Sequence, residues 1–545
     1  MIVLMLSADF FYFPEVRRHM TEDIILAWRD KDFIITYIIK NYLWILILIC
    51  VLSIYFTKKI FKFIDRQYSP KYMNLFKQIS ILFVVIVIVV LGIRSNFYFK
   101  ERPLNLTNAY RLLKKTENIQ LILNGVFTQY HSLVYEDKEK GVINNGYPLD
   151  QGLKNARNFL LSDNEIFSNE EYPLMRCLKN TKKTSNYNVV IILLESWTPK
   201  YIDSFNGNIG YGVTPAFDKI AEGGIKFVNA YSAGSRSQYG LIASLIGMQA
   251  VHGVIRYYGF DMMSRITQIA QPFNKRGYFT MYAQSFPRKS IYMCSVAKGI
   301  LNFSEAYGSQ DYTKLMDISN DYDDYAMFDF ISKKLEEIHN QGKPFFIYAF
   351  TGTTHVPFIQ TTSQFEKYPP ISNENKYLNT LYYADYSIGY FIEKAKKDGY
   401  FDNTIVIFMA DHPVPFALHS MDTKQRFKIP FVIYAPKIFK PQVIKHTVSQ
   451  ADLIPTLYHL MNINEPFSAV GVNALDNNAN HFALICDGMN IVFVDKNGDY
   501  VTSNRDVIME SSLKKNDTKY YELNNILLSL DKSIVELFIH NRWYT

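Results

Sequence analysis

The chain has 545 residues, of which 20% are charged and 15% aromatic, and its formal net charge is +7. This length suffices for two or more domains with a large core. Because no basic run is interleaved with aromatic residues, a nucleic-acid partner is not expected. The cysteines show neither metal-type nor paired spacing, which argues against a zinc knuckle and a disulfide scaffold; they are Cys50, Cys177, Cys294 and Cys486.

The first hundred residues hold most of the apolar excess. Residues 1–13 are apolar but too short to cross a bilayer, and we interpret them as the end of a hydrophobic helix. Residues 33–56 and 78–97 approach the length of about 20 residues that a transmembrane helix needs. Two buried helices of a soluble fold are the alternative. We interpret residues 1–97 as a membrane region.

The loop between the two predicted spans is strongly basic and contains one acid, Asp65. Its basic residues are Lys58, Lys59, Lys62, Arg66, Lys71 and Lys77. The positive-inside rule places this loop in the cytoplasm and the chain after Arg94 outside it. We therefore expect a multi-pass protein of the cell (inner) membrane with an extracytoplasmic catalytic domain.

Three further regions follow the membrane segments. Residues 98–183 have a mainly helical pattern and are interpreted as a connector. In residues 184–475, strand-like runs alternate with helical ones, which predicts an α/β domain with a mostly parallel central sheet flanked by helices. The predicted strands are 188–194, 278–283, 344–350, 404–409 and 430–434. Residues 476–545 complete this domain with a small antiparallel sheet, from 481–485 and 491–494, and a helix over 532–540.

Polar residues stand where several buried strands end. Glu195 follows the wholly apolar strand over 188–194, and Asp411 and His412 follow the strand over 404–409. A third strand leads to His355. The carboxyl ends of parallel strands meet at one sheet edge, where open α/β sheets bind their ligands. Two carboxylates and an imidazole predict a divalent-cation site, and these ligand types suit Mn²⁺, Mg²⁺ or Zn²⁺.

Ser237 precedes an apolar helical pattern and is predicted to be the N-cap of that helix. A hydroxyl beside a bound cation becomes a nucleophile, and a helix N-terminus favours an incoming phosphate. Each group also has a purely structural interpretation. Asp411-His412 can form a turn, Ser237 can be only a cap, and His355 can belong to a surface loop. Ser196, which adjoins Glu195, is expected to be only a helix cap.

Taken together, these motifs resemble the lipoteichoic acid synthase and phosphoglycerol transferase family, within the alkaline phosphatase and sulfatase superfamily. The motifs in order are Glu195, Gly-Ser-Arg-Ser237, Thr-His355-Val-Pro and Asp411-His412, with a closing segment at Ser449-Gln-Ala-Asp452 and Gly471. The resemblance implies an alkaline-phosphatase-like α/β fold preceded by transmembrane helices. By the same comparison, the chain begins inside the third of those helices.

The resemblance also implies roles for individual residues. Glu195, Asp411 and His412 would bind the metal, Mn²⁺ before Mg²⁺ or Zn²⁺, and Ser237 would be both ligand and nucleophile in place of the family's threonine. His355 would contact the substrate phosphate or pass a proton to the leaving group. The implied substrate-binding residues are Arg236, His355, Gln284 and Arg288. Pro413 departs from the family's glycine, and the sulfatase pattern after the nucleophile is missing, which disfavours sulfate ester hydrolysis.

The function implied is transfer of a phosphoglycerol head group from a phospholipid, phosphatidylglycerol, to an envelope glycan or growing polymer. Ser237 would attack phosphorus, and an acceptor hydroxyl would then displace the serine. Three alternatives stay open. They are a phosphoethanolamine transferase, a sulfatase-like hydrolase of phosphate or sulfate esters, and a scaffold without enzymatic activity.

Overall fold

The structure is a computed structural model with two compact units, Met1–Lys140 and Gly141–Thr545. It describes residues 5, 9, 44, 47, 51–63, 65, 76–77, 79–85, 126, 146–179 and 184–545. Within the last range it leaves out 250–264, 289, 291–292, 314–321, 356–357, 359–360, 415, 417–423, 488–489 and 505–506.

In the first unit, residues 51–63 and 79–85 are helical, and their large apolar side chains are exposed. Most of the two predicted spans, 33–56 and 78–97, lies outside the described residues, as does nearly all of 1–13. Within the part of the chain that the structure describes, no helix combines the length and the apolar character needed to cross a bilayer.

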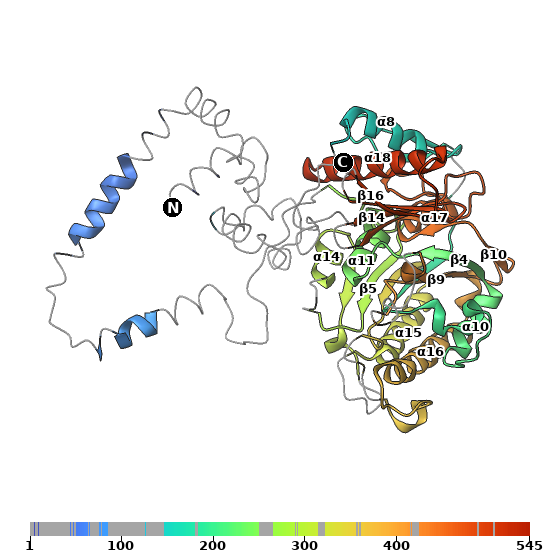
Figure 1. The fold of residues 1–545 in the computed structure, drawn as a ribbon. Coiled ribbons are helices and arrows are strands. Elements are labelled where there is room, and N and C mark those ends of the chain that lie inside the picture. Colours follow the sequence, from blue (N-terminus) through green and yellow to red (C-terminus); the bar gives the residue numbers. More distant parts are fainter. Residues whose placement is uncertain are drawn as a thin grey trace. The chain divides into compact units, whose positions relative to one another are not determined.

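The second unit is organised around a nine-stranded mixed sheet (Figure 1). Its strand order is β10-β4-β9-β8-β3-β7-β5-β6, and β11 also pairs with β4. Only β9 runs antiparallel to its neighbours, β4 and β8. The strands are β3 (Asn188–Leu194), β4 (Ile225–Tyr231), β5 (Phe279–Gln284), β6 (Glu305–Tyr307), β7 (Phe345–Phe350), β8 (Thr404–Ala410), β9 (Lys428–Tyr434), β10 (Gln442–Ile444) and β11 (Val448–Ser449).

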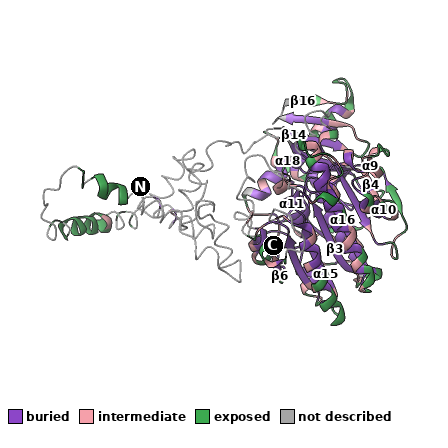
Figure 2. Cartoon of the chain, turned by 90° about the horizontal axis from the view of Figure 1, so that it is seen from below, coloured by how far each residue is buried: buried purple, intermediate pink, exposed green. Residues whose placement is uncertain are grey.

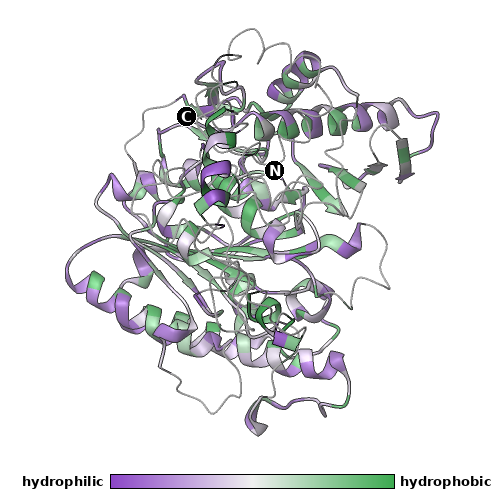
Figure 3. Ribbon diagram, turned by 90° about the vertical axis from the view of Figure 1, so that its left-hand side faces the viewer, coloured by the Kyte–Doolittle hydropathy of each residue, from purple (hydrophilic) through white to green (hydrophobic). Residues whose placement is uncertain are grey.

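The predicted mostly parallel sheet is therefore confirmed. All five predicted strands are present, as β3, β5, β7, β8 and β9, with bounds within two residues of those expected. Every residue of β3, β7 and β8 is buried, because the sheet has helices on both faces (Figure 2). Such strands contain continuous apolar runs, which makes them visible in the sequence. In Figure 3 these central strands are hydrophobic, whereas the outer helices alternate between polar and apolar residues.

Helices cover both faces of this sheet. α15 and α10 each pack against α16 on one face, and α11 and α17 pack against each other on the other face (Figure 1). The helices are α9 (Asp203–Asn206), α10 (Pro215–Gly223), α11 (Ser237–Ile246), α13 (Gln271–Asn274), α14 (Met293–Gly299), α15 (Asp324–Asn340), α16 (Asn373–Lys397) and α17 (Leu453–Met461). The 3₁₀ turns are η2 (Pro199–Tyr201), η4 (Ser309–Asp311), η5 (Ser363–Phe365), η6 (Phe401–Asn403), η8 (Gln425–Phe427) and η9 (Gln450–Asp452).

Two smaller sheets complete the unit. The C-terminal sheet is antiparallel, as predicted, with β13 (Phe482–Asp487), β14 (Asn490–Asp495), β15 (Tyr500–Asn504) and β16 (Val507–Ser511). The helix that follows, α18 (Thr518–Ile539), is longer than the predicted helix and packs against α8 (Leu149–Leu160). The third sheet contains β1 (Glu165–Phe167), β2 (Met175–Leu178) and β12 (Phe467–Ser468). Residues 146–179 of the predicted connector thus pack within the second unit.

Candidate active site

Two neighbouring strand ends bring the acidic residues together. β3 and β8 are parallel neighbours, and their pairing ends with Leu194 beside Ala410. Glu195 and Asp411 therefore leave the sheet side by side. One ligand atom from each of Glu195, Asp411 and His412 lies within 4.8 Å of the other two. The pattern of strand-end residues thus predicted which side chains meet.

Ser237 joins this group from the first turn of α11. Its Oγ lies 3.2 Å from Glu195 Oε2 and 3.1 Å from His412 Nε2. The prediction that Ser237 is the N-cap is wrong. Arg236 occupies that position with extended backbone angles, and Ser237 is the first helical residue. The Ser237 hydroxyl consequently points at the carboxylate and the imidazole.

The His412 ring is oriented by its own backbone. Nδ1 lies 2.9 Å from the carbonyl oxygen of Pro413, which can only accept a hydrogen bond, so Nδ1 carries the proton. In this tautomer of the neutral ring Nε2 is the nitrogen with a free lone pair, and it faces the site, 3.5 Å from Asp411 Oδ2. A histidine that ligates a metal typically has its second nitrogen held in this way. Pro413, which departs from the family pattern, still supplies the carbonyl that fixes the ring.

The two carboxyl groups are buried next to each other, and no lysine or arginine among the described residues forms an ion pair with either. Glu195 is 1% exposed and Asp411 is fully buried. Burial raises the pKa of Glu195, and burial together with the neighbouring Glu195 raises the pKa of Asp411 to about 8. The cluster thus offers two carboxylates, an imidazole nitrogen and a hydroxyl, and Asp411 Oδ2 has no hydrogen-bond donor among the described residues. This set of groups fits a divalent cation.

Ser196 contacts both Glu195 and Asp411. Its position in the sequence did not predict these contacts. Its backbone N–H donates to Asp411 Oδ1 and its Oγ–H to Glu195 Oε1, each over 2.7 Å. Its φ is +59°, in the left-handed region. The prediction that Ser196 caps a helix is wrong, because the N-cap of the following η2 turn is Thr198.

Gly240 and Gln450 also position the site, and the sequence alone did not predict this. A Cβ on Gly240 would lie 2.6 Å from the Asp411 carbonyl oxygen, so only glycine lets α11 approach this strand end. Gln450 donates to the carbonyls of Ala410 and Asp411 and accepts from the Ala233 N–H. It thereby joins β8 to the loop before Ser237. Gln450 lies within the closing segment noted in the sequence, but neither residue type indicates such a role by itself.

His355 lies at the same sheet edge, beyond β7. The preceding Thr354 hydroxyl donates to the Glu195 carbonyl. The His355 ring packs edge-on against Phe286 and Tyr322, with centroids 5.4 and 5.7 Å apart, and its Nδ1 is buried without a hydrogen-bond partner among the described residues. The structure records no direct contact between the described side chains of His355 and Ser237. His355 thus directly follows Thr354, whose hydroxyl contacts Glu195.

The three other predicted substrate-binding residues differ in their surroundings. Arg236 is exposed beside Ser237. Gln284 is buried, and its amide bonds to the Tyr282 hydroxyl and the Pro287 carbonyl. Arg288 forms a bidentate pair with Asp311, over 2.6 and 2.8 Å. Gln284 and Arg288 are therefore engaged within the chain, and their contact with substrate stays a prediction.

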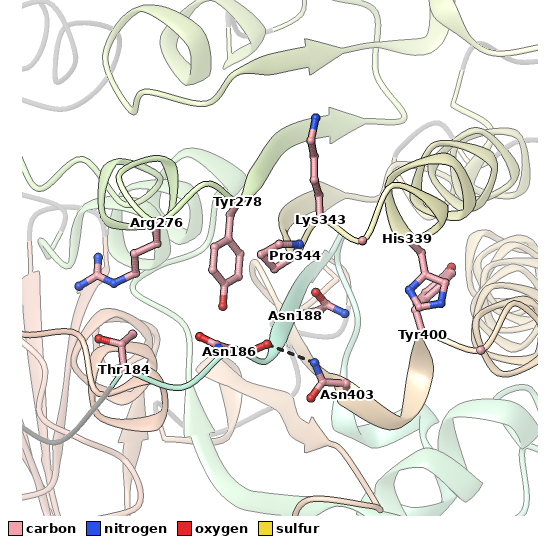
Figure 4. Close-up of a pocket in the computed structure, with 12 residues that line it drawn as sticks. Thr184, Asn186, Asn188, Arg276, Tyr278, His339, Lys343, Pro344, Tyr400 and Asn403 are labelled. Atoms are coloured by element: carbon pink, nitrogen blue, oxygen red, sulfur yellow. Dashed lines mark hydrogen bonds between the residues drawn. The ribbon is translucent and has the colours of Figure 1, made fainter.

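A cavity of about 750 Å³ lies at the opposite edge of the sheet, where β3, β5, β7 and β8 begin (Figure 4). Its lining includes Asn188, Tyr278 and Pro344, and Asn403 donates to the carbonyl of Asn186 across it. Ligands of parallel α/β sheets bind at the carboxyl ends of the strands. The cavity is thus at the edge remote from Glu195 and Asp411.

The chain is similar in sequence to several known proteins. The chain is 22% identical over 415 residues to lipoteichoic acid synthase 1 of Bacillus subtilis strain 168, covering 65% of this chain and 62% of that protein. It is 26% identical over 182 residues to lipoteichoic acid synthase-like YvgJ of the same strain, covering 29% of each. Phosphoglycerol transferase I of Escherichia fergusonii is 31% identical over 93 residues, covering 17% of this chain and 12% of that protein. The chain thus spans less than two thirds of the length of these relatives.

Solved structures share the fold. A protein in the alkaline phosphatase superfamily from Vibrio parahaemolyticus superimposes with a TM-score of 0.63 at 20% identity, covering 75% of this chain and all of that one. The lipoteichoic acid synthase LtaP from Listeria monocytogenes gives a TM-score of 0.54 at 18% identity, covering 71% and 98%. The resemblance drawn from the motifs is thereby confirmed. Residues 187–463, just over half of the sequence, match the Sulfatase family, and the chain belongs to that family.

Proposed function

We propose that this protein is a metal-dependent phosphotransferase that moves a phosphoglycerol head group from a phospholipid to an envelope glycan or polymer. The observation that carries the proposal is the position of the Ser237 hydroxyl, 3.2 Å from Glu195 and 3.1 Å from His412 at the start of a helix. Similarity to lipoteichoic acid synthases and phosphoglycerol transferase I supports the choice of substrate class.

In this proposal Glu195, Asp411, His412 and Ser237 hold a divalent ion, with Mn²⁺ preferred over Mg²⁺ or Zn²⁺. When bound, the ion supplies charge neutralisation and favours the deprotonated hydroxyl. Ser237 releases its proton to water, and its Oγ forms a bond to the phosphorus of phosphatidylglycerol. The bond from phosphorus to the diacylglycerol oxygen breaks, and that oxygen leaves as an alcohol after taking a proton from His355.

The second half of the reaction regenerates the serine. The oxygen of an acceptor hydroxyl attacks the same phosphorus and passes its proton to His355, the bond to Ser237 Oγ breaks, and the serine recovers a proton from water. The N-terminal turn of α11 places backbone N–H groups and the positive end of the helix beside the phosphate. Arg236, exposed next to Ser237, would add a contact to the phosphate, and Gln284 and Arg288 would do so after rearrangement of their present contacts.

The proposal includes a location that suits a lipid donor. Residues 1–97 would anchor the chain in the cell (inner) membrane, 98–183 would connect the anchor to the catalytic domain, and 184–475 with 476–545 would form that domain outside the cytoplasm. An anchor of this kind keeps the site close to the head groups of the bilayer.

Mass spectrometry of the full chain after incubation with phosphatidylglycerol and Mn²⁺ tests this function. A phosphoglycerol adduct on Ser237 is expected, lost in Ser237→Ala and retained in the neighbouring control Ser235→Ala. An adduct formed only with phosphatidylethanolamine would show that the protein is a phosphoethanolamine transferase instead. Release of phosphate or sulfate from soluble esters without any lipid-derived adduct would replace the transferase with a hydrolase.

A further inference from the structure

Ser196 adopts a backbone conformation that is unusual for a serine. Five described residues other than glycine have a positive φ, and the other four are asparagines. Asparagine tolerates the left-handed region, whereas serine rarely adopts it. Strained residues of this kind persist only where surrounding contacts impose the conformation. The contacts of Ser196 therefore indicate what the strain accomplishes.

Ser196 forms a hydrogen bond with one oxygen of each carboxylate and none with the other oxygen. The Ser196 N–H bonds to Asp411 Oδ1 and its hydroxyl to Glu195 Oε1. The remaining oxygens face the site, because Glu195 Oε2 meets the Ser237 hydroxyl at 3.2 Å and Asp411 Oδ2 lies 3.5 Å from His412 Nε2. Ser196 thus contacts both carboxylates, and the His412 N–H, which donates to the same Asp411 Oδ1 at 2.7 Å, adds a second bond to Asp411. A helical or extended backbone at this position would turn the N–H or the side chain away.

Tyr377 holds the third polar group of Ser196. Its hydroxyl, from the N-terminal part of α16, donates to the Ser196 carbonyl at 2.9 Å. The Tyr377 ring is fully buried and contacts the rings of Tyr201, Phe358 and Phe416, with centroids 5.4, 5.5 and 5.6 Å apart. These three rings follow β3, β7 and β8 in turn. The hydroxyl is therefore fixed by the same strand ends that carry the site.

We propose that Ser196 is a positioning residue that orients Glu195 and Asp411 toward a shared cation, and that Tyr377 locks Ser196 in the conformation this requires. The inference rests on the metal site of the proposed function. Residues that orient metal ligands without touching the metal typically change metal affinity by about 10- to 100-fold when altered. Ser196 acts through the carboxylates, so its effect should appear in metal binding even without lipid substrate.

The test measures the dissociation constant of Mn²⁺ for the purified full chain, together with melting without metal. Ser196→Ala should weaken Mn²⁺ binding by about 10- to 100-fold. Tyr377→Phe should weaken it in the same direction by a smaller factor. Melting without metal should change little in either variant. Ser196→Ala keeps the N–H bond to Asp411 and loses only the hydroxyl bond to Glu195, and Tyr377→Phe loses only the bond to the Ser196 carbonyl. If Ser196→Ala does not fold, Ser196→Gly removes the same hydroxyl and accepts the positive φ without strain.

Two control variants remove buried hydroxyls elsewhere. Ser387→Ala deletes a hydroxyl that donates to the Tyr383 carbonyl within α16, and Tyr400→Phe deletes one at the opposite sheet edge. Both should bind Mn²⁺ as the parent chain does. Parent-like binding by Ser196→Ala and Tyr377→Phe, with binding lost in Glu195→Gln, would overturn the positioning role and leave the metal site intact. Parent-like binding by Glu195→Gln as well would overturn the metal site and the proposed function with it.

Discussion

Ser237 Oγ and His412 Nε2 lie 3.1 Å apart although 175 positions separate them in the chain. The hydroxyl is at the start of α11, and the imidazole follows β8. Each is oriented by a neighbour that needs no metal. Arg236 takes the N-cap position, so Ser237 is turned inward, and the Pro413 carbonyl accepts the Nδ1 proton of His412. The pair is thus arranged by the fold itself.

Replacing either acid by its amide should stabilise the metal-free protein and abolish its stabilisation by metal. Glu195 and Asp411 lie side by side, and burial, together with the neighbouring Glu195, raises the pKa of Asp411 to about 8. Asp411→Asn removes that repulsion, so melting in a chelator should occur at a higher temperature than for the parent chain. A ligand at 100 times its dissociation constant contributes about 2.7 kcal/mol, and this increment should be missing when Mn²⁺ is added. Equal Mn²⁺ stabilisation of the variant and the parent chain would contradict the assignment.

Gly240→Ala should disrupt the site by steric conflict. The new methyl group would lie 2.6 Å from the Asp411 carbonyl oxygen and 2.9 Å from its Cα, both of them backbone atoms that cannot move aside. We expect a loss of about 1 to 3 kcal/mol in unfolding free energy and weaker Mn²⁺ binding. Gly152→Ala is the matched control, because that helical glycine has its nearest neighbour at 3.5 Å. The control should be neutral or slightly stabilising in chemical denaturation.

Removing the charge of Arg176 should destabilise the second unit strongly. This fully buried side chain bonds to Glu165 and to the carbonyls of Ala469 and Gly471, and it joins β2 to the segment after β12. Arg176→Met leaves Glu165 buried, with the contact to His459 Nε2 at 2.9 Å still in place. A loss of about 3 to 5 kcal/mol is expected. Urea denaturation of the double variant with Glu165→Gln should show partial recovery, and an additive effect would contradict the pairing.

Stability should fall as the pH drops from about 6.5 toward 4, in part because of His481. Its ring stacks on His446 with centroids 3.6 Å apart, and burial and His446 lower the pKa of His481 to about 4. Between these pH values the unfolded chain binds a proton at His481 that the folded chain does not bind. Each such group therefore lowers the free energy of unfolding by at most about 1.4 kcal/mol per pH unit. Thermal melts of His481→Asn should depend less steeply on pH than those of the parent chain. An unchanged slope would show that other groups cause the dependence.

The sequence predicted the parts of the site that follow directly from buried strands. β3 and β8 are continuous apolar runs, so Glu195 and Asp411 could be placed at one edge before any coordinates were known. The role of Ser196 could not be predicted, because its left-handed backbone is imposed by Tyr377 and Asp411, which are distant in sequence. Gly240 and Gln450 act through contacts between elements that are far apart in the sequence. The periodic pattern of apolar residues within one helix or strand does not indicate such contacts. Likewise, no local pattern indicates that Arg288 pairs with Asp311.

The direction of β9 decides at which sheet edge Ser237 arrives. β9 is antiparallel to β8, and β4 is antiparallel to β9, so two reversals return β4 to the direction of β8. The chain leaving β4 at Tyr231 therefore emerges at the edge that carries Asp411, six residues before Ser237. If β4 paired directly with β8 in an antiparallel manner, the same loop would deliver its serine to the remote edge. β9 therefore determines at which edge Ser237 arrives, although none of its side chains belongs to the cluster of Glu195, Asp411 and His412.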